Sequence, residues 1–253
     1  MSANLRVKSS EFIDETHRIS FKFNGKTYYG FKGDTLASAL LANNVHLVGR
    51  SFKYHRPRGI MTAGSEEPNA IVQVNDNTNR TEPNVRATEV EIYEGLEASS
   101  QNCWPSVNFD IGGINNIISP FLPAGFYYKT FMWPASFWEK YEFFIRHSAG
   151  LGKSPTDKDP DIYDHRNIHC DVLVVGAGIS GILAAKNAAK NNLKTLLIEE
   201  KNELGGATIN QNREFNKIDN QSSSDWIKKE INELKTCLLY TSPSPRCLLY
   251  TSP

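Results

Sequence analysis

The sequence predicts two domains of different class, an α+β domain followed by the start of an α/β domain. Residues 19–29 alternate apolar and polar side chains around an Asn-Gly pair, and residues 35–40 then read as a helix with one apolar face. Residues 172–198 read instead as two apolar strands separated by a glycine-rich turn and an alanine-rich helix. The two patterns differ in period, and they lie far apart in the chain.

The first pattern is a β-hairpin followed by a helix. The Asn-Gly pair at 24–25 favours a type I′ turn, and either Asp34 or Thr35 can cap the helix. Residues 70–74 and 89–93 supply later strands. A hairpin, a helix and returning strands indicate a β-grasp domain of the ferredoxin type.

The second pattern is a dinucleotide-binding βαβ motif, which opens a Rossmann domain. A strand enters the G-x-G-x-x-G loop at 176–181, and the second strand ends at Glu199. Gly176 allows the tight turn, Gly178 lets a pyrophosphate approach the backbone, and Gly181 lets the helix pack closely. Glu199 can accept hydrogen bonds from the adenosine ribose. The alternative is a glycine turn in another kind of α/β domain.

Composition sets the remaining limits. The 28 Lys and Arg residues balance 28 Asp and Glu residues, so charge gives no reason to expect a nucleic-acid or membrane-surface partner. There is no apolar stretch of membrane-spanning length and no signal-peptide core, so a cytoplasmic protein is expected. The four cysteines form no C-x-x-C pair, and His147, His165 and His169 lack ligand spacing. No metal site is therefore predicted.

Several long strings between about Arg18 and about Ala207 resemble the alpha subunit of heterotetrameric sarcosine oxidase. They are Thr35-Leu-Ala-Ser-Ala-Leu-Leu-Ala42, Gly49-Arg-Ser-Phe-Lys-Tyr-His-Arg-Pro-Arg-Gly59, Ala63-Gly-Ser-Glu-Glu-Pro-Asn-Ala70, Pro123-Ala-Gly-Phe-Tyr-Tyr-Lys-Thr-Phe-Met-Trp-Pro134 and Ala135-Ser-Phe-Trp-Glu-Lys140. The resemblance implies an oxidoreductase with beta, gamma and delta partner subunits. That enzyme oxidises sarcosine to glycine and hydrogen peroxide, and passes the carbon unit to tetrahydrofolate.

The resemblance also implies where cofactors lie. NAD is expected on the dinucleotide fold of alpha, with FAD as the alternative, because the motif spacing does not separate the two. FAD lies on beta, FMN lies between alpha and beta, and tetrahydrofolate is handled by the carboxyl-terminal half of alpha, which this sequence lacks. No catalytic residue is assigned, and this N-terminal fragment alone is expected to be inactive.

Matching positions extend the motif to a full candidate site. An acid at position 199 disfavours NADP, whose 2′-phosphate it would repel, and Lys201 softens that argument. A double glycine follows the acid, as in flavoproteins that bind two dinucleotides. The predicted cofactor-binding residues are Gly176, Gly178, Ser180, Gly181, Glu199, Glu200, Lys201, Gly205, Gly206 and Ala207.

The N-terminal domain raises the question of an iron–sulfur cluster. Related cyanide-forming and opine-oxidising enzymes bind a [2Fe–2S] cluster after the Arg-Pro-Arg-Gly loop, with C-x4-C-x2-C spacing. That spacing falls here on Thr62, Glu67 and Ala70, none of which is a thiolate, whereas plant-type clusters need four cysteines. The sarcosine oxidase resemblance likewise implies a clusterless domain. A structural module without an electron-transfer centre is predicted.

Two groups of side chains, one basic and aromatic and the other aromatic, can each be interpreted as structural or as functional. Residues 50–58 interleave basic and aromatic side chains, and we interpret them as a folded loop at a domain or subunit interface rather than a nucleic-acid site. Residues 126–144 are dense in aromatics, which favours packing between domains or subunits, with a ligand-binding cage as the alternative. Residues 152–164 read as a polar linker.

The end of the chain repeats itself, since residues 237–243 recur as residues 247–253. A translated sequencing adaptor explains this repeat, and a genuine low-complexity tail is the alternative. The predicted organisation is an arm (1–17), a clusterless β-grasp domain (18–98), a connecting segment (99–165), a partial Rossmann domain (166–235) and the adaptor-derived tail (236–253). Two other identities stay open: the alpha subunit of an FAD-dependent amine, opine or proline-type dehydrogenase, and an inactive truncated product.

Overall fold

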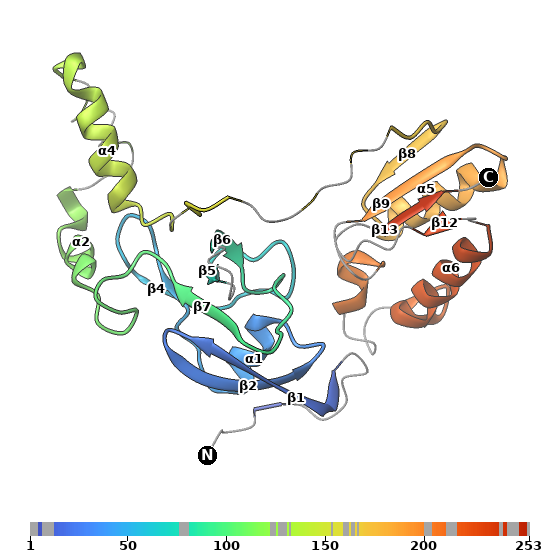
Figure 1. The fold of residues 1–253 in the computed structure, drawn as a ribbon, viewed down its shortest axis with the longest axis horizontal. Coiled ribbons are helices and arrows are strands. Elements are labelled where there is room, and N and C mark those ends of the chain that lie inside the picture. The colour runs from blue at the N-terminus through green and yellow to red at the C-terminus, as the bar shows by residue number, and fades with distance from the viewer. Residues whose placement is uncertain are drawn as a thin grey trace. The chain divides into compact units, whose positions relative to one another are not determined.

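The structure is a computed structural model that divides into two compact units. The units span residues 1–161 and 162–253, and each is described by itself (Figure 1). The described residues are 5–6, 13–75, 81–121, 125, 131, 133–152, 154–158, 162, 165, 167–199, 204–210, 217–237, 240–241 and 248–251.

A five-stranded mixed sheet forms the centre of the first unit. Its strands are β1 (Asp14–Phe23), β2 (Lys26–Lys32), β5 (Ile71–Asn75), β6 (Thr81–Arg86) and β7 (Leu96–Ser100), in the order β2-β1-β7-β5-β6. β1 and β7 run parallel, and the other neighbours run antiparallel. Asn24 and Gly25 both have positive φ, at 50° and 76°, as a type I′ turn requires. The predicted hairpin is confirmed.

Helix α1 (Leu36–Ala42) packs on this sheet through its apolar face. Thr35 is the N-cap, and its hydroxyl accepts from the N–H of Ser38 at 3.2 Å. Asp34, the other candidate cap, is fully buried and accepts instead from the N–H of Phe31, the Ser38 hydroxyl and the Arg6 guanidinium. The core of the unit consists of Ile19, Phe21, Phe23, Leu36, Ala37, Ala39, Leu40, Val48, Ala70, Val72, Val74, Ala87, Ile92, Leu96 and Ala98.

One predicted strand is wrong. Residues 89–93 form no strand, only a single bridge from Glu91 to Thr35, and the strand of this region is β7. The N–H of Leu36 donates to the carbonyl of Val90, and the N–H of Ile92 donates to that of Asp34. The alternating pattern therefore reflects packing against the start of α1, with Ile92 buried in the core.

The rest of the first unit consists of short elements. β3 (Gly49–Arg50) and β4 (Pro57–Arg58) form a two-stranded ribbon. The segment that follows β7 contains η1 (Ile111–Gly113), α2 (Ile114–Ile117), η2 (Ser119–Phe121), η3 (Ala135–Phe137) and α4 (Trp138–Ser148). Among the described residues from 101 to 165, no strand forms.

The second unit is built on a parallel βαβ arrangement. β8 (Val172–Val175) pairs in parallel with β9 (Thr195–Glu199), and α5 (Ile179–Lys190) connects them. α5 packs on both strands and on α6 (Ser223–Cys237) (Figure 1). Lys186 of α5 pairs with Glu230 and Glu233 of α6. Between β9 and α6 the chain forms η4 (Gly206–Asn210), β10 (Lys217–Ile218) and β11 (Gln221–Ser222). The core consists of Ala177, Ile182, Ala185, Leu197, Leu204, Trp226, Ile227 and Leu234.

The repeated tail contributes two short strands to the same sheet. β12 (Tyr240–Thr241) pairs with β13 (Leu248–Thr251), and β13 runs antiparallel to β9. In a doubly wound sheet of order 3-2-1, the edge beside the second strand receives a third parallel strand. An open strand edge pairs readily with any extended segment, whatever its origin. The adaptor origin of residues 236–253 therefore stays a prediction.

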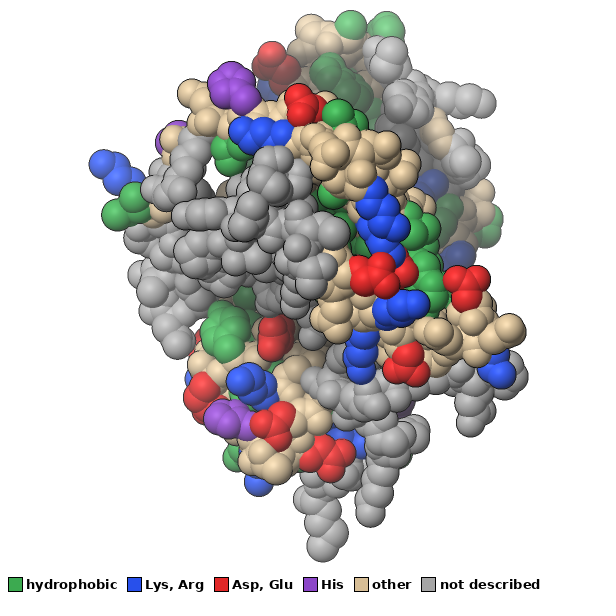
Figure 2. Space-filling model, turned by 90° about the vertical axis from the view of Figure 1, so that its right-hand side faces the viewer, with side chains coloured by type: hydrophobic (Ala, Val, Ile, Leu, Met, Phe, Trp, Pro, Cys, Tyr) green, Lys and Arg blue, Asp and Glu red, His purple; other side chains and the backbone are tan. Residues whose placement is uncertain are grey.

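Two surface properties bear on partners. In the part of the chain that the structure describes, the helices are all too short or too polar to cross a lipid bilayer. On the face shown in Figure 2, basic and acidic side chains are interspersed. This mixing agrees with the balance of 28 basic and 28 acidic residues in the sequence.

Candidate functional site

The glycine loop lies where β8 ends and α5 begins. Gly176 has φ +93°, a conformation that favours glycine, and its N–H donates to the carbonyl of Ile198 at 2.7 Å. Gly178 is the N-cap of α5 and supplies no side-chain hydrogen bond to the helix. A Cβ placed on Gly178 would meet nothing within 4 Å. The space over this glycine is therefore open beside the N–H groups of the first helical turn.

Gly181 has a different role in the same loop. A Cβ there would lie 1.9 Å from the carbonyl oxygen of Gly176, and the backbone offers no flexible atom that could move away. The first turn of α5 thus approaches the end of β8 too closely for any side chain at this position. Ser180 lies between Gly178 and Gly181 in the sequence, and its side chain is exposed at the start of α5.

Glu199 ends β9 and faces the glycine loop. Its side chain is buried, and Oε2 accepts from the N–H of Ala177 at 2.5 Å. This bond fixes the carboxylate at the carboxyl end of the second strand, next to Gly176 and Gly178. Glu200 and Lys201, the neighbours predicted to surround a ribose, lie outside the described residues.

The double glycine returns to the same loop. The N–H of Gly205 donates to the carbonyl of Ala177 at 2.8 Å. A Cβ on Gly206 would lie 3.1 Å from the Cα of Gly178, so a larger residue would press on the loop. Ala207 follows in η4 and is exposed. The structure thus brings together the glycine loop, the acid and the double glycine.

This arrangement fits the adenosine diphosphate half of a dinucleotide. The helix start offers N–H groups and a positive dipole end for phosphates, with no side-chain cap on it. The open space over Gly178 admits a group close to the backbone. The carboxylate of Glu199 supplies the acceptor that a ribose needs.

In the first unit, the loop at residues 61–70 holds a carboxylate of its own. The buried carboxylate of Glu67 accepts four backbone N–H groups, from Met61, Thr62, Asn69 and Ala70. Burial acts to raise the pKa of Glu67, but these four hydrogen bonds outweigh it and hold the pKa below its ordinary value. The sequence pattern marked Glu67 only as a position without cysteine, because a lone glutamate in a polar loop carries no signal of its contacts.

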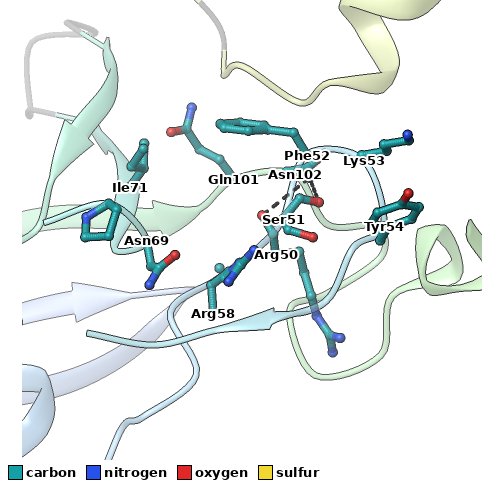
Figure 3. Close-up of a pocket in the computed structure, with 12 residues that line it drawn as sticks. Arg50, Ser51, Phe52, Lys53, Tyr54, Arg58, Asn69, Ile71, Gln101 and Asn102 are labelled. Carbon is teal, nitrogen blue, oxygen red and sulfur yellow. Dashed lines mark hydrogen bonds between the residues drawn. The ribbon is translucent and has the colours of Figure 1, made fainter. Parts of the chain in front are cut away.

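The basic loop at 50–58 lines a cavity of about 310 Å³ (Figure 3). Arg50 donates to the carbonyl of Val107, at 2.8 Å from Nε and 2.6 Å from Nη2. His55 Nδ1 lies 2.7 Å from a carboxylate oxygen of Asp110, and Arg56 donates to the side chain of Asn116. These bonds tie the loop to residues 107–116, which favours its interpretation as a folded loop.

Comparison with protein-family models matches each unit separately. Residues 16–103 match a model described as a 2Fe-2S iron-sulfur cluster binding domain, and residues 171–240 match a model described as an FAD dependent oxidoreductase. The chain thus resembles an iron–sulfur-type domain in its first unit and the dinucleotide region of FAD-dependent oxidoreductases in its second.

Two proteins similar to this chain over most of its length are alpha subunits of an enzyme. The chain is homologous to sarcosine oxidase subunit alpha of Rhizobium meliloti (strain 1021), with 51% identity over 92% of this chain and 23% of the relative. It is 32% identical to sarcosine oxidase subunit alpha of Corynebacterium sp. (strain P-1), over 88% of this chain and 18% of that relative. The chain therefore spans about a fifth of the length of these curated relatives.

A solved structure has a similar fold. L-proline dehydrogenase from P. horikoshii matches with a TM-score of 0.51 and 18% identity, over 85% of this chain and 31% of the other. At this identity the likeness concerns the fold alone.

The contrast between the two loop glycines gives a stability prediction. Gly181→Ala forces the turn apart and destabilises the second unit by about 1–3 kcal/mol, the usual cost of overpacking. Gly178→Ala is the matched control: its φ of −69° suits alanine and its Cβ meets nothing, so the change stays within about 0.5 kcal/mol. Native-state amide exchange of β8 and β9 measures both. Equal protection in the two variants would contradict the packing argument.

Proposed function

We propose that the second unit is the start of a Rossmann domain that binds the adenosine diphosphate half of a dinucleotide. The chain then acts as the dinucleotide-binding N-terminal part of the alpha subunit of a sarcosine-oxidising enzyme. The observation that supports this proposal most directly is the open, uncapped start of α5 at Gly178, next to the carboxylate of Glu199. The 51% identity to a sarcosine oxidase alpha subunit supports the choice of enzyme.

Each residue of the site has a distinct role in binding. Gly178 admits the pyrophosphate, and the N–H groups of Ile179, Ser180 and Gly181 hold its negative charge. The carboxylate of Glu199, oriented by the N–H of Ala177, accepts from the ribose hydroxyls.

The surrounding positions complete the proposed site. Glu200 and Lys201 lie next to the ribose in this proposal, and the backbone of Gly205, Gly206 and Ala207 closes the phosphate side. When bound, the nicotinamide or flavin supplies the chemistry of hydride transfer. Binding and orientation of the cofactor are the tasks proposed for this chain, and no residue of it is proposed as catalytic.

Two dinucleotides, NAD and FAD, contain the adenosine diphosphate group that this site is proposed to bind. NAD is the cofactor that the alpha-subunit resemblance implies, and Glu199 suits its free ribose hydroxyls. FAD is favoured by the family model that matches residues 171–240. Both carry the same adenosine diphosphate, so titration of each one separately distinguishes them.

For the whole assembly, the proposed reaction is oxidation of sarcosine to glycine with formation of hydrogen peroxide and transfer of the carbon unit to tetrahydrofolate. In this proposal beta, gamma and delta subunits complete the enzyme, with FAD on beta and FMN between alpha and beta. A dehydrogenase of amines, opines or proline has no comparable support, because the likeness to L-proline dehydrogenase is at 18% identity.

Gly178→Val tests the binding site. The branched side chain fills the space where the pyrophosphate approaches, so the expected result is loss of measurable binding in calorimetric titrations with NAD and with FAD. Gly113→Val is the matched control, because Gly113 also has open space around its Cβ position but lies in the first unit. Binding by Gly178→Val at the affinity of the unchanged chain would refute the site. Failure of the unchanged chain to bind either dinucleotide would favour an inactive truncated product.

Glu199→Ala tests the ribose contact. Loss of a hydrogen bond to a charged acceptor weakens the binding of the preferred dinucleotide by about 1–3 kcal/mol. Glu199→Gln keeps an acceptor for Ala177 but removes the charge, so it separates loop support from ribose recognition. Titration with adenosine diphosphate reports the same contact without the second nucleotide half. Unchanged affinity in Glu199→Ala would exclude this role.

The segment that follows β7 in the first unit is proposed as the contact with a partner subunit. Several large apolar side chains are mostly exposed there, which is unusual for a surface that stays free. They are Trp104, Phe109, Ile117, Phe121, Trp133 and Phe144. The relatives are named as alpha subunits, so each belongs to an assembly with at least one other subunit. We propose that such a subunit covers this aromatic surface.

Paired substitutions test this surface. Phe121→Ser with Phe144→Ser should abolish co-elution with the partner subunits in size-exclusion chromatography, because exposed aromatics contribute much of the binding energy of interfaces. Ile162→Ser is the control, since Ile162 is 96% exposed but lies outside the aromatic surface. Circular dichroism checks that each variant folds. Undiminished co-elution of the double variant would place the interface elsewhere.

A further inference from the structure

The loop at residues 61–70 is closed around a carboxylate of its own. The Glu67 side chain is 1% exposed, although glutamate is almost never buried without a partner. Oε2 accepts from the N–H groups of Met61 and Thr62 at 2.8 and 2.7 Å, and Oε1 accepts from those of Asn69 and Ala70 at 2.8 and 3.0 Å. The Thr62 hydroxyl adds a fifth contact at 3.2 Å. Both carboxylate oxygens are thus satisfied from within the loop.

Two neighbours seal the loop from the side of β6. The buried Thr88 hydroxyl donates to the carbonyl of Gly64 at 2.7 Å. The Nε of Arg86 donates to the backbone carbonyl of Glu67 at 3.2 Å, while its Nη1 lies 3.4 Å from Glu89. These contacts hold the loop backbone, whereas Met61, Thr62, Asn69 and Ala70 of the loop itself donate to the carboxylate.

The donors around this carboxylate are those an anionic centre requires. Four N–H groups converge on one site from both ends of the loop, and N–H groups arranged in this way favour negative charge. Although burial raises the pKa of Glu67, the four bonds together lower it below the ordinary value, which keeps the side chain ionised at neutral pH.

The thiolates that a cluster needs are not present in this loop. A plant-type [2Fe–2S] cluster requires four cysteines in C-x4-C-x2-C spacing with a fourth further on, and the three loop positions hold Thr62, Glu67 and Ala70. Cys103 is the only cysteine in the sequence before residue 162. Burial first, and then the charge of Asp110, raises the pKa of its thiol, which disfavours the thiolate form. The residues of this domain do not fit a cluster.

We propose that Glu67 is the built-in anion around which this loop folds, in a domain that matches an iron–sulfur family model but lacks the cysteines such a cluster needs. The carboxylate supplies the negative charge that orders the loop, so the domain reaches its fold without metal. The dinucleotide proposal for the second unit is independent of this inference.

Glu67→Gln in the full chain tests the proposal, with Glu66→Gln as the matched control. An amide nitrogen cannot accept a hydrogen bond, so one pair of N–H groups loses its acceptor. The amides of residues 61, 62, 69 and 70 should exchange about 10- to 100-fold faster in Glu67→Gln. Glu66 is the neighbouring carboxylate and is exposed, so its replacement should leave these rates unchanged.

The outcomes separate clearly. Equal exchange rates in Glu67→Gln and the unchanged chain would overturn the proposal. A Glu67→Gln chain that does not fold, beside a folded Glu66→Gln chain, would support it.

A second measurement needs no variant. The unchanged chain is incubated anaerobically with ferrous iron, sulfide and a thiol reductant, desalted and reduced. The expected result is no iron retained beyond a protein-free control and no [2Fe–2S] signal in electron paramagnetic resonance. Retained iron with that signal would overturn the inference.

Discussion

In both units, side-chain carboxylates that accept hydrogen bonds from backbone N–H groups fix the conformation of the loops that define the two candidate sites. Glu67 gathers four such groups in the first unit, and Glu199 takes the N–H of Ala177 in the second. Asp34 and Asp110 do the same for the turn before α1 and for the segment after β7. Because buried N–H groups that lack an acceptor are costly, each acid determines where its loop can fold.

The two units use this interaction to opposite effect. In the first unit the loop is closed, since both oxygens of Glu67 accept hydrogen bonds from N–H groups within it. In the second unit the start of α5 has no side-chain cap, and Gly178 leaves the approach open. An anion from outside can therefore complete the second site but not the first.

Local patterns in the sequence predicted the elements whose contacts are themselves local. The hairpin at Asn24, helix α1 and the βαβ unit follow from period, turn residues and caps, and they were found. The strand expected at 89–93 was wrong, because its alternation arises from packing on α1, which a local pattern does not reveal. The role of Glu67 and the bonds between Arg50 and Val107 were also missed. Both depend on which backbone groups converge in space, and Val107 lies 57 residues from Arg50 along the chain.

The central claim is that the glycine loop, the first turn of α5 and Glu199 form one binding site for adenosine diphosphate. Titration of adenosine diphosphate into the isotopically labelled chain, followed by amide resonances, tests it most directly. The account predicts saturable shifts at the amides of Ala177, Ile179, Ser180 and Gly181, with the loop around Glu67 unaffected. An absence of shifts at these amides, or saturable shifts confined to the first unit, would contradict it.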